Sequence, residues 1–214
     1  MSHWLCADQR PKIGLSDNFR RKFHQTYFDA QILQNDYDDL LASRHRGRDV
    51  IRYEWRDGTL ILSENDTTEI ADRSEIIGKW TCARVELLAD HQGEELVRAL
   101  LQLVPLVRRQ PAGTFGVNLL RNFAGRTTAP HHEMEEFVIN YVLNRIGAEA
   151  ETYLYDPNDL RSDGSAAAPM LRTQLGAGSI LIFEDRKFMQ ATTSLINLPN
   201  ETASYDALVC TIDY

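Results

Sequence analysis

The stretch PHHEMEEFVINYVL, residues 130–143, joins imidazole and carboxylate side chains to an apolar run that only Asn140 interrupts. The run predicts a β-strand in the core. In an extended chain, side chains two positions apart share a face, so His131 and Glu133 point to one side and His132 to the other. An imidazole and a carboxylate make two thirds of the ligand set of many non-haem iron enzymes. We therefore expect a functional site at the entrance of this strand, and a solvated acidic entrance is the alternative.

The C-terminal half predicts a series of strands. Short apolar or alternating runs are separated there by Gly, Pro, Asn and Asp, which favour turns. The predicted strands span residues 114–123, 137–144, 151–155, 179–183, 190–196 and 207–214. Residues 156–169 predict a surface loop. Strands that follow helices in this way favour helices packed against a β-sandwich or barrel, and not alternating βαβ units.

The N-terminal half predicts helices and one hairpin. Ser16 or Asp17 caps a first helix in which aromatic residues recur at helical spacing, and a short helix follows over residues 37–41. Residues 50–62 predict a β-hairpin around the Asp57-Gly58 turn. Residues 66–90 are ambiguous, with short strands around 69–70 and 83–88. A further helix spans residues 94–107, and Pro105 bends or ends it.

Composition excludes several classes of protein. With 31 acidic against 23 basic residues, the net charge of −8 argues against a nucleic-acid binder, which needs clustered Lys and Arg. No apolar run is long enough to span a membrane, and the N-terminus does not have the pattern of a signal peptide. The three cysteines are far apart and form no paired motif, which favours a reduced, cytoplasmic protein.

Five stretches of the second half carry a family resemblance. They are VNLLR (117–121), His131-x-Glu133 followed by FV (137–138), ETYLYD (151–156), LGAGSILIFEDR (175–186) and YDALV (205–209). In order and spacing the chain resembles the small bacterial 2-oxoglutarate/Fe(II) dioxygenases that hydroxylate free amino acids, the isoleucine 4-hydroxylase type. The resemblance implies a mainly β protein with N-terminal helices, built around a double-stranded β-helix (jelly roll). A length of 214 residues suits a single domain, 1–214. The resemblance covers residues 114–214, which are expected to form the jelly-roll core that carries the site, and residues 1–113 are expected to give helical and hairpin support.

The resemblance also implies roles for individual residues. His131 and Glu133 match the first two iron ligands, and Gln190 stands where a later histidine is expected. Tyr205 stands where an arginine would pair with the far carboxylate of 2-oxoglutarate, and Arg121 is a further candidate for cofactor binding. An amide is a poorer iron ligand than imidazole, and a phenol cannot give the charged bidentate contact of arginine. The resemblance implies Fe(II) as cofactor, and these two departures weaken that inference and argue against the use of 2-oxoglutarate in the usual way.

Three functions remain open from the sequence. The first is a divergent iron oxygenase acting on an amino acid or related small metabolite, with Gln190, His132 or water completing the metal site. The second is the same barrel used for non-oxidative chemistry (isomerase, cyclase or lyase), in which His131, His132, Glu133 and Glu135 supply acid and base. The third is a catalytically inactive scaffold that binds a metabolite or a partner.

Overall fold

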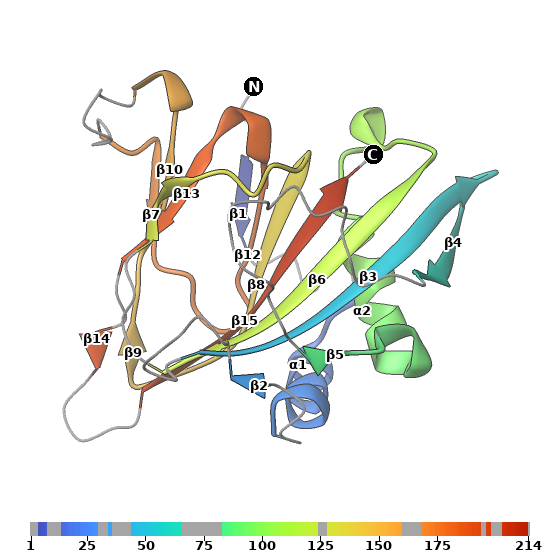
Figure 1. Cartoon of the computed structure of the whole chain (residues 1–214), viewed down its shortest axis with the longest axis horizontal. Coiled ribbons are helices and arrows are strands. Elements are labelled where there is room, and N and C mark those ends of the chain that lie inside the picture. The colour runs from blue at the N-terminus through green and yellow to red at the C-terminus, as the bar shows by residue number, and fades with distance from the viewer. Residues whose placement is uncertain are drawn as a thin grey trace.

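The structure, a computed structural model, describes residues 4–7, 14–29, 34–35, 44–65, 83–123, 128–159, 168–193, 196–197 and 203–213. Figure 1 shows three layers: a small sheet, a large sheet and a layer with the two α-helices. We call the face of the large sheet that is turned to the small sheet its inner face, and the face that carries the helices its outer face. Within the described residues, no helix is long and apolar enough to cross a membrane.

The elements follow one another along the chain in this order, with η marking π- and 3₁₀-helical segments. They are β1 (Trp4–Ala7), α1 (Asp17–His24), η2 (Gln25–Asp29), β2 (Gln34–Asn35), β3 (Arg44–Arg56), β4 (Thr59–Glu64), β5 (Ala83–Arg84), η3 (Leu87–Ala89), α2 (His91–Leu101), η4 (Leu106–Arg108), β6 (Ala112–Asn122), β7 (Thr128–His131), β8 (Phe137–Ile146), β9 (Ala148–Glu149), β10 (Thr152–Tyr155), η5 (Pro157–Asp159), β11 (Leu171–Thr173), β12 (Ile180–Glu184), η6 (Asp185–Lys187), β13 (Met189–Thr192), β14 (Ile196–Asn197) and β15 (Ser204–Asp213).

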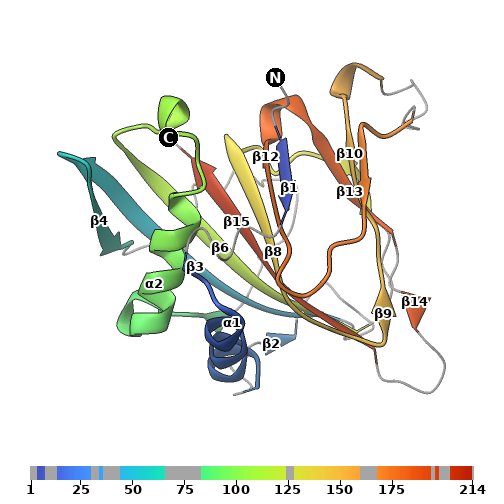
Figure 2. The same cartoon turned by 180° about the vertical axis from the view of Figure 1, so that it is seen from behind.

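The strand order is that of a jelly roll. The large sheet runs β1-β12-β8-β15-β6-β3-β2, with β4 and β5 also paired to β3, and the small sheet runs β11-β10-β13-β7. The chain passes from the large sheet to the small sheet and back over β6, β7 and β8, and from the small sheet to the large sheet and back over β11, β12 and β13 (Figure 2). The predicted fold class, a mainly β jelly roll with N-terminal helices, is therefore confirmed. The predicted division of the chain at residue 113 stays a prediction.

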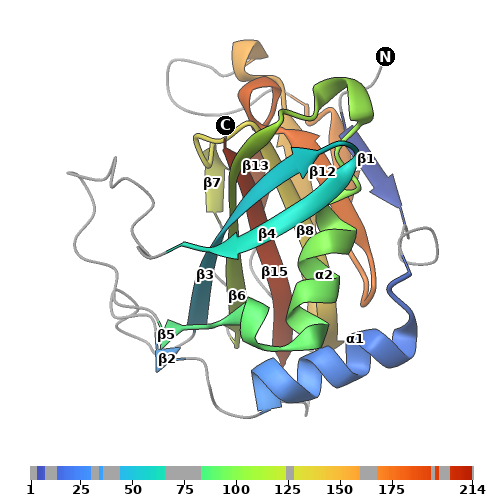
Figure 3. The same cartoon turned by 90° about the vertical axis from the view of Figure 1, so that its right-hand side faces the viewer.

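The outer face of the large sheet packs against the helices (Figure 3). Alternate residues of β8 point to this side, and they join the aromatic residues of α1 and the leucines of α2 in one core cluster. Ser16 begins α1, because its hydroxyl oxygen accepts a hydrogen bond from Phe19 N at 3.1 Å. The helical spacing of Phe19 and Phe23 thus places both rings against the sheet, as the sequence predicted.

The inner face carries a second, smaller core. Val138 and Val142 of β8 pack there against Leu181 and Phe183 of β12 and against Leu154 of β10 in the small sheet. Because β8 is buried on both faces, its sequence is almost continuously apolar and lacks the alternation of a surface strand. We define the barrel mouth as the end of the barrel formed by residues 131–136 and 185–190.

Four sequence predictions differ from the structure or lie outside it. The helix predicted over residues 94–107 begins at His91 and ends at Leu101, because Pro105 adopts an extended conformation with φ −56° and ψ 133°. The hairpin is confirmed, but its first strand, β3, begins at Arg44 and pairs with β6 along most of its length. The helix predicted at 37–41 and the strand predicted at 69–70 lie outside the described residues.

Candidate functional site

The turn between β7 and β8 crosses from the small sheet to the large sheet at the barrel mouth. Met134, at its centre, has a φ of 68°, a left-handed backbone conformation that residues other than glycine rarely adopt. Asp185 of η6 lies beneath the turn, and only 1% of its surface is exposed. Its carboxylate accepts hydrogen bonds from the backbone N–H groups of Glu133, Met134 and Glu135 at 3.1, 2.8 and 3.2 Å. The turn is thus held by one buried carboxylate.

His131 and Glu133 meet at this turn. His131 Nδ1 lies 2.8 Å from the carbonyl oxygen of Ala129, and His131 Nε2 lies 3.3 Å from Glu133 Oε1. A carbonyl oxygen can only accept, so Nδ1 must carry a proton. In a neutral imidazole Nε2 is then an acceptor, and it faces a carboxylate oxygen that is also an acceptor. The pair therefore calls for a positive charge between its two atoms, either a second imidazole proton or a metal ion.

The surroundings shift both groups toward their charged forms. The hydrogen bond to Glu133 raises the pKa of His131, although burial acts in the opposite direction. The same bond lowers the pKa of Glu133, and the guanidinium groups of Arg46 and Arg48 on β3 lower it further. Residues Ile51 and Tyr53 of β3 face the helices, so alternation turns Arg46 and Arg48 to the inner face. Positive charge thus lies near the carboxylate inside the barrel.

Gln190 is brought to the same place by strand pairing. It is the register partner of His131 in the β13–β7 ladder. Its Oε1 accepts a hydrogen bond from Asn140 Nδ2 at 2.8 Å, across the space between the two sheets. Asn140 is 5% exposed, and its own Oδ1 has no hydrogen-bond partner within the described part of the chain. The structure therefore groups His131, Glu133 and Gln190 at one end of the barrel, with Asn140 as a further polar neighbour.

The other two predicted catalytic residues are used differently. His132 points away from His131, and its Nδ1 lies 2.5 Å from the backbone oxygen of Asp185. Glu135 is buried at the end of the turn and donates its backbone N–H to Asp185. Both residues thus contribute to the packing of the turn, and their predicted catalytic roles stay predictions.

Tyr205 and Arg121 lie at the opposite end of the large sheet. Tyr205 packs against the inner core beside Arg145 of β8, its register partner, and burial raises the pKa of its phenol. Arg121 lies on the outer face, where its Nε and Nη2 donate to the two carboxylate oxygens of Asp206 at 2.8 Å each. Sequence reasoning did not single out Asp206, nor His24, whose Nε2 lies 2.6 Å from Asp206 Oδ2. The cofactor-binding roles proposed for Tyr205 and Arg121 stay predictions.

The residues at the mouth fit two positions of a metal ion. Two ligands about 2.1 Å from an octahedral ion and at right angles lie about 3.0 Å apart, close to the 3.3 Å between His131 Nε2 and Glu133 Oε1. Among the residues that the structure describes, no three His, Cys, Asp or Glu side chains converge on one point. The protein thus offers an imidazole and a carboxylate, with a neutral amide at Gln190 as the nearest third group.

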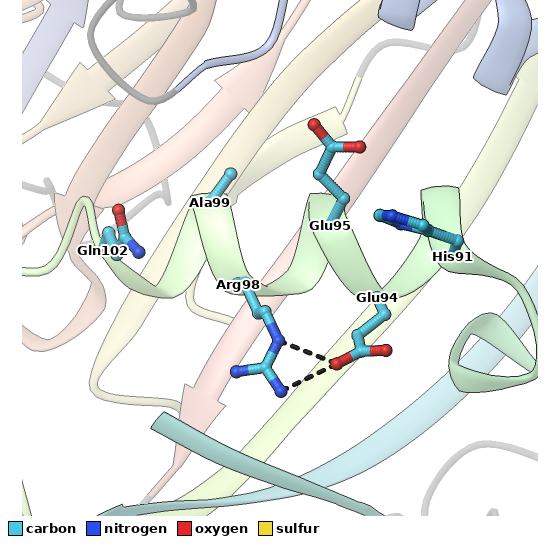
Figure 4. A pocket seen from close by; sticks show the side chains of 6 residues that line it. All are labelled: His91, Glu94, Glu95, Arg98, Ala99 and Gln102. Atoms are coloured by element: carbon cyan, nitrogen blue, oxygen red, sulfur yellow. Dashed lines mark hydrogen bonds and ion pairs between the residues drawn. The ribbon is translucent and has the colours of Figure 1, made fainter. Parts of the chain in front are cut away.

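A separate surface pocket of about 550 Å³ lies on α2, away from the barrel mouth (Figure 4). Its largest polar feature is an ion pair in which Arg98 contacts Glu94 Oε1 through Nε at 2.8 Å and Nη2 at 2.7 Å. The pocket is lined by His91, Glu94, Glu95, Arg98, Ala99 and Gln102. This ion pair joins two residues four positions apart on one helix, and unlike the pair at the barrel mouth it contains no histidine.

Comparison with known proteins identifies similar folds. No protein-family model matches the sequence, and no curated protein is detectably similar to it. Among solved structures, a bsmA homologue from Methylobium petroleophilum PM1 superposes with a TM-score of 0.73 at 18% identity, over 99% of this chain and 88% of that one. IDO from Bacillus thuringiensis gives a TM-score of 0.68 at 14% identity, over 99% and 93% of the two chains.

A third solved structure is the Fe(II)/(alpha)ketoglutarate-dependent dioxygenase TqaL. It gives a TM-score of 0.66 at 14% identity and covers 99% of this chain and 82% of that one. The superpositions establish the fold, whereas sequence identities this low leave the type of substrate open. Over nearly its whole length the chain has the same jelly-roll fold as an Fe(II)/α-ketoglutarate-dependent dioxygenase.

Proposed function

We propose that the protein is an enzyme of the non-haem iron oxygenase kind, with His131 and Glu133 as its metal ligands and an amino acid or related small metabolite as its substrate. The observation that carries the proposal is the contact between His131 Nε2 and Glu133 Oε1, two acceptor atoms 3.3 Å apart. A divalent cation would satisfy both atoms at once. The fold shared with TqaL supports the choice of iron over other cations.

Each residue of the site would have a defined task. Bound iron would supply the redox chemistry of oxygen activation. The backbone oxygen of Ala129 fixes the imidazole tautomer, which leaves the lone pair of Nε2 free to bind a metal. Asp185 holds the turn that carries Glu133. Arg46 and Arg48 would bind the carboxylate of an amino-acid substrate, because guanidinium groups match carboxylates in charge and shape.

We further propose that 2-oxoglutarate is not used in the usual way. The position at which the resemblance expects an arginine carries Tyr205, whose phenol stays neutral because burial raises its pKa. A neutral phenol donates one hydrogen bond and cannot give a bidentate ionic contact.

Non-oxidative acid–base chemistry is the second candidate, and one observation favours it. A proton between His131 and Glu133 satisfies the pair as well as a metal does, and the pKa of His131 is already raised by that contact. His131 would then act as a general acid, with Glu133 keeping it protonated.

Metal analysis separates the two candidates. Protein purified without chelator should contain close to one equivalent of iron, and His131→Ala and Glu133→Ala should each lose it. The control is His24→Gln, which alters the other histidine–carboxylate pair and should leave the iron content unchanged. Absence of metal in an active protein would establish the acid–base alternative. Strong 2-oxoglutarate-dependent succinate release by the unaltered protein would contradict the proposal on 2-oxoglutarate.

A further inference from the structure

The sequence contains no feature that distinguishes Asp185 from any other acidic residue after a strand, yet its carboxylate has an unusual set of partners. It accepts three consecutive backbone N–H groups, those of residues 133–135, and it is 1% exposed. His132 Nδ1 contacts the backbone oxygen of the same residue. Asp185 therefore connects η6 to every residue of the turn between 132 and 135.

We infer that Asp185 is a positioning residue that sets the geometry of the His131–Glu133 pair. Strand β7 ends at His131, the chain turns after His132, and in this conformation Glu133 Oε1 lies 3.3 Å from the imidazole Nε2. In that turn Met134 adopts a φ of 68°, which is unfavourable for a residue other than glycine. Asp185 Oδ2 accepts the N–H groups of Met134 and Glu135, one on each side of the strained residue's Cα, and so stabilises this conformation.

The chain contains a matched control. Asp49 of β3 is likewise a buried aspartate that accepts backbone N–H groups, from Val50 at 2.9 Å and from Leu87 at 2.8 Å. It lies on the outer face, where it connects β3 to η3. Asp185→Asn and Asp49→Asn therefore make the same chemical change at two buried anchors, of which only Asp185 contacts the turn at the barrel mouth.

The first measurement is amide hydrogen exchange. Asp185→Asn should accelerate exchange at residues 133–135, because an amide has one acceptor oxygen in place of two and places an N–H₂ group against backbone donors. Asp49→Asn should accelerate exchange at Val50 and Leu87 and leave residues 133–135 unchanged. Unaltered protection of residues 133–135 in Asp185→Asn would overturn the inference.

The second measurement concerns the pair itself and requires no metal. In a crystal structure of Asp185→Asn, His131 Nε2 and Glu133 Oε1 should lie beyond hydrogen-bonding distance. Adding Met134→Gly should bring them together again, because glycine adopts a positive φ at little cost. A pair that keeps its separation in Asp185→Asn would show that Asp185 supports the turn without positioning the ligands. If Asp185→Asn does not fold, Asp185→Glu replaces it, since the longer side chain keeps the charge and displaces the carboxylate.

The third measurement rests on the proposed function. In anaerobic titrations with Fe(II) alone, Asp185→Asn should bind about 10- to 100-fold more weakly, the usual effect of losing a residue that orients a metal ligand. Asp49→Asn should bind like the unaltered protein. Equal Fe(II) affinity in both variants would overturn the positioning role. If the unaltered protein binds no Fe(II), the proposed function fails, and the separation of the pair in the Asp185→Asn crystal structure still decides the role of Asp185.

Discussion

Two histidine–carboxylate pairs lie on opposite faces of the large sheet, and they differ in how completely the protein satisfies them. On the outer face, Asp206 accepts two hydrogen bonds from Arg121 and contacts His24, and its side chain is 1% exposed. At the barrel mouth, Glu133 contacts His131 through two facing atoms that need a proton or a metal ion between them, and the two side chains are 34% and 39% exposed.

The difference shows how the same residue types serve two purposes. The outer-face pair is closed by a guanidinium, so its charges are balanced within the protein, and it connects η2 and α1 to β6 and β15. Arg121 also donates to Phe28 O at 3.0 Å, and the His24 ring stacks on that of Phe28 at 5.3 Å. The pair at the mouth is partly exposed to solvent, and a proton or a metal ion must join its two facing atoms. We therefore expect changes at the outer-face pair to alter stability, and changes at the mouth to alter binding.

The largest effect is expected from Arg121→Ala. Removing the guanidinium leaves the carboxylate of Asp206 buried without its main partner, which typically lowers the free energy of unfolding by about 3–5 kcal/mol. Urea denaturation monitored by circular dichroism measures this loss, while Fe(II) binding by the folded fraction should not change. A loss below about 1 kcal/mol would show that His24 alone satisfies Asp206.

The next effect is expected from Gln190→His, which would add an imidazole beside His131 and Glu133. Imidazole is a far better iron ligand than an amide, so Fe(II) affinity should rise about tenfold or more, equivalent to about 1.4 kcal/mol. Adding Tyr205→Arg should produce measurable 2-oxoglutarate consumption. Gln190→Leu is the control, because it removes the amide without adding a ligand and should not tighten binding. Gln190→His and the double variant with Tyr205→Arg could instead lose the native activity and gain neither tighter Fe(II) binding nor 2-oxoglutarate consumption. That result would show that Gln190 and Tyr205 contact the substrate.

A smaller effect is expected from acid. Burial alone would raise the pKa of Asp206, but Arg121 and His24 lower it below its ordinary value of 3.8. A carboxyl group with a lowered pKa stabilises the fold fully above its unfolded pKa and loses this contribution as the pH falls through the folded pKa. The unaltered protein should therefore lose more stability than Asp206→Asn as the pH is lowered below about 4. Parallel urea titrations at pH 5 and pH 3 would detect the difference, and identical losses would contradict it.

The smallest effect is expected from Glu94→Ala on α2. It measures how much an exposed ion pair contributes to the free energy of unfolding, for comparison with the buried pair of Arg121 and Asp206. Glu94 and Arg98 stand one helical turn apart and are 43% and 39% exposed, so water and salt screen their attraction. Removing Glu94 should lower the free energy of unfolding by about 0.3–0.5 kcal/mol. A loss comparable to that of Arg121→Ala would mean that burial does not distinguish the two ion pairs.

The sequence predicts the strands that have strong local patterns and misses those that depend on their neighbours. The apolar run of β8 and the Asp57-Gly58 turn are local signals, and both predictions agree with the structure. The short strand β7 contains Pro130, which normally argues against a strand. It is tolerated because β7 forms the edge of the small sheet, where a missing N–H costs no ladder hydrogen bond. The polar residues at the start of β3 form a strand because they pair with β6, and no local sequence pattern shows this pairing.

Some residues of the candidate site could likewise be predicted from the sequence, and others could not. The sequence predicts His131 and Glu133 on one face of an extended strand, whereas in the structure they meet across the turn that follows β7. The order of the family-like stretches brings Gln190 to the same end of the barrel. Asp185 could not be singled out, because its partners are backbone N–H groups that any residue provides. The pairing of Asp206 with Arg121 and His24 depends on side chains 85 and 182 positions away, a separation that only the folded chain closes.

Strand β1 has a consequence for how the protein can be handled. Residues 4–7 pair antiparallel with β12, whose five residues are all buried, and so cover one edge of the large sheet. Without this segment β12 would present a row of open backbone donors and acceptors on a largely apolar strand, an arrangement that favours edge-to-edge aggregation. Removal of the first seven residues during cloning should therefore lower the yield of soluble protein, whereas a tag added before Trp4 leaves the pairing of β1 with β12 in place.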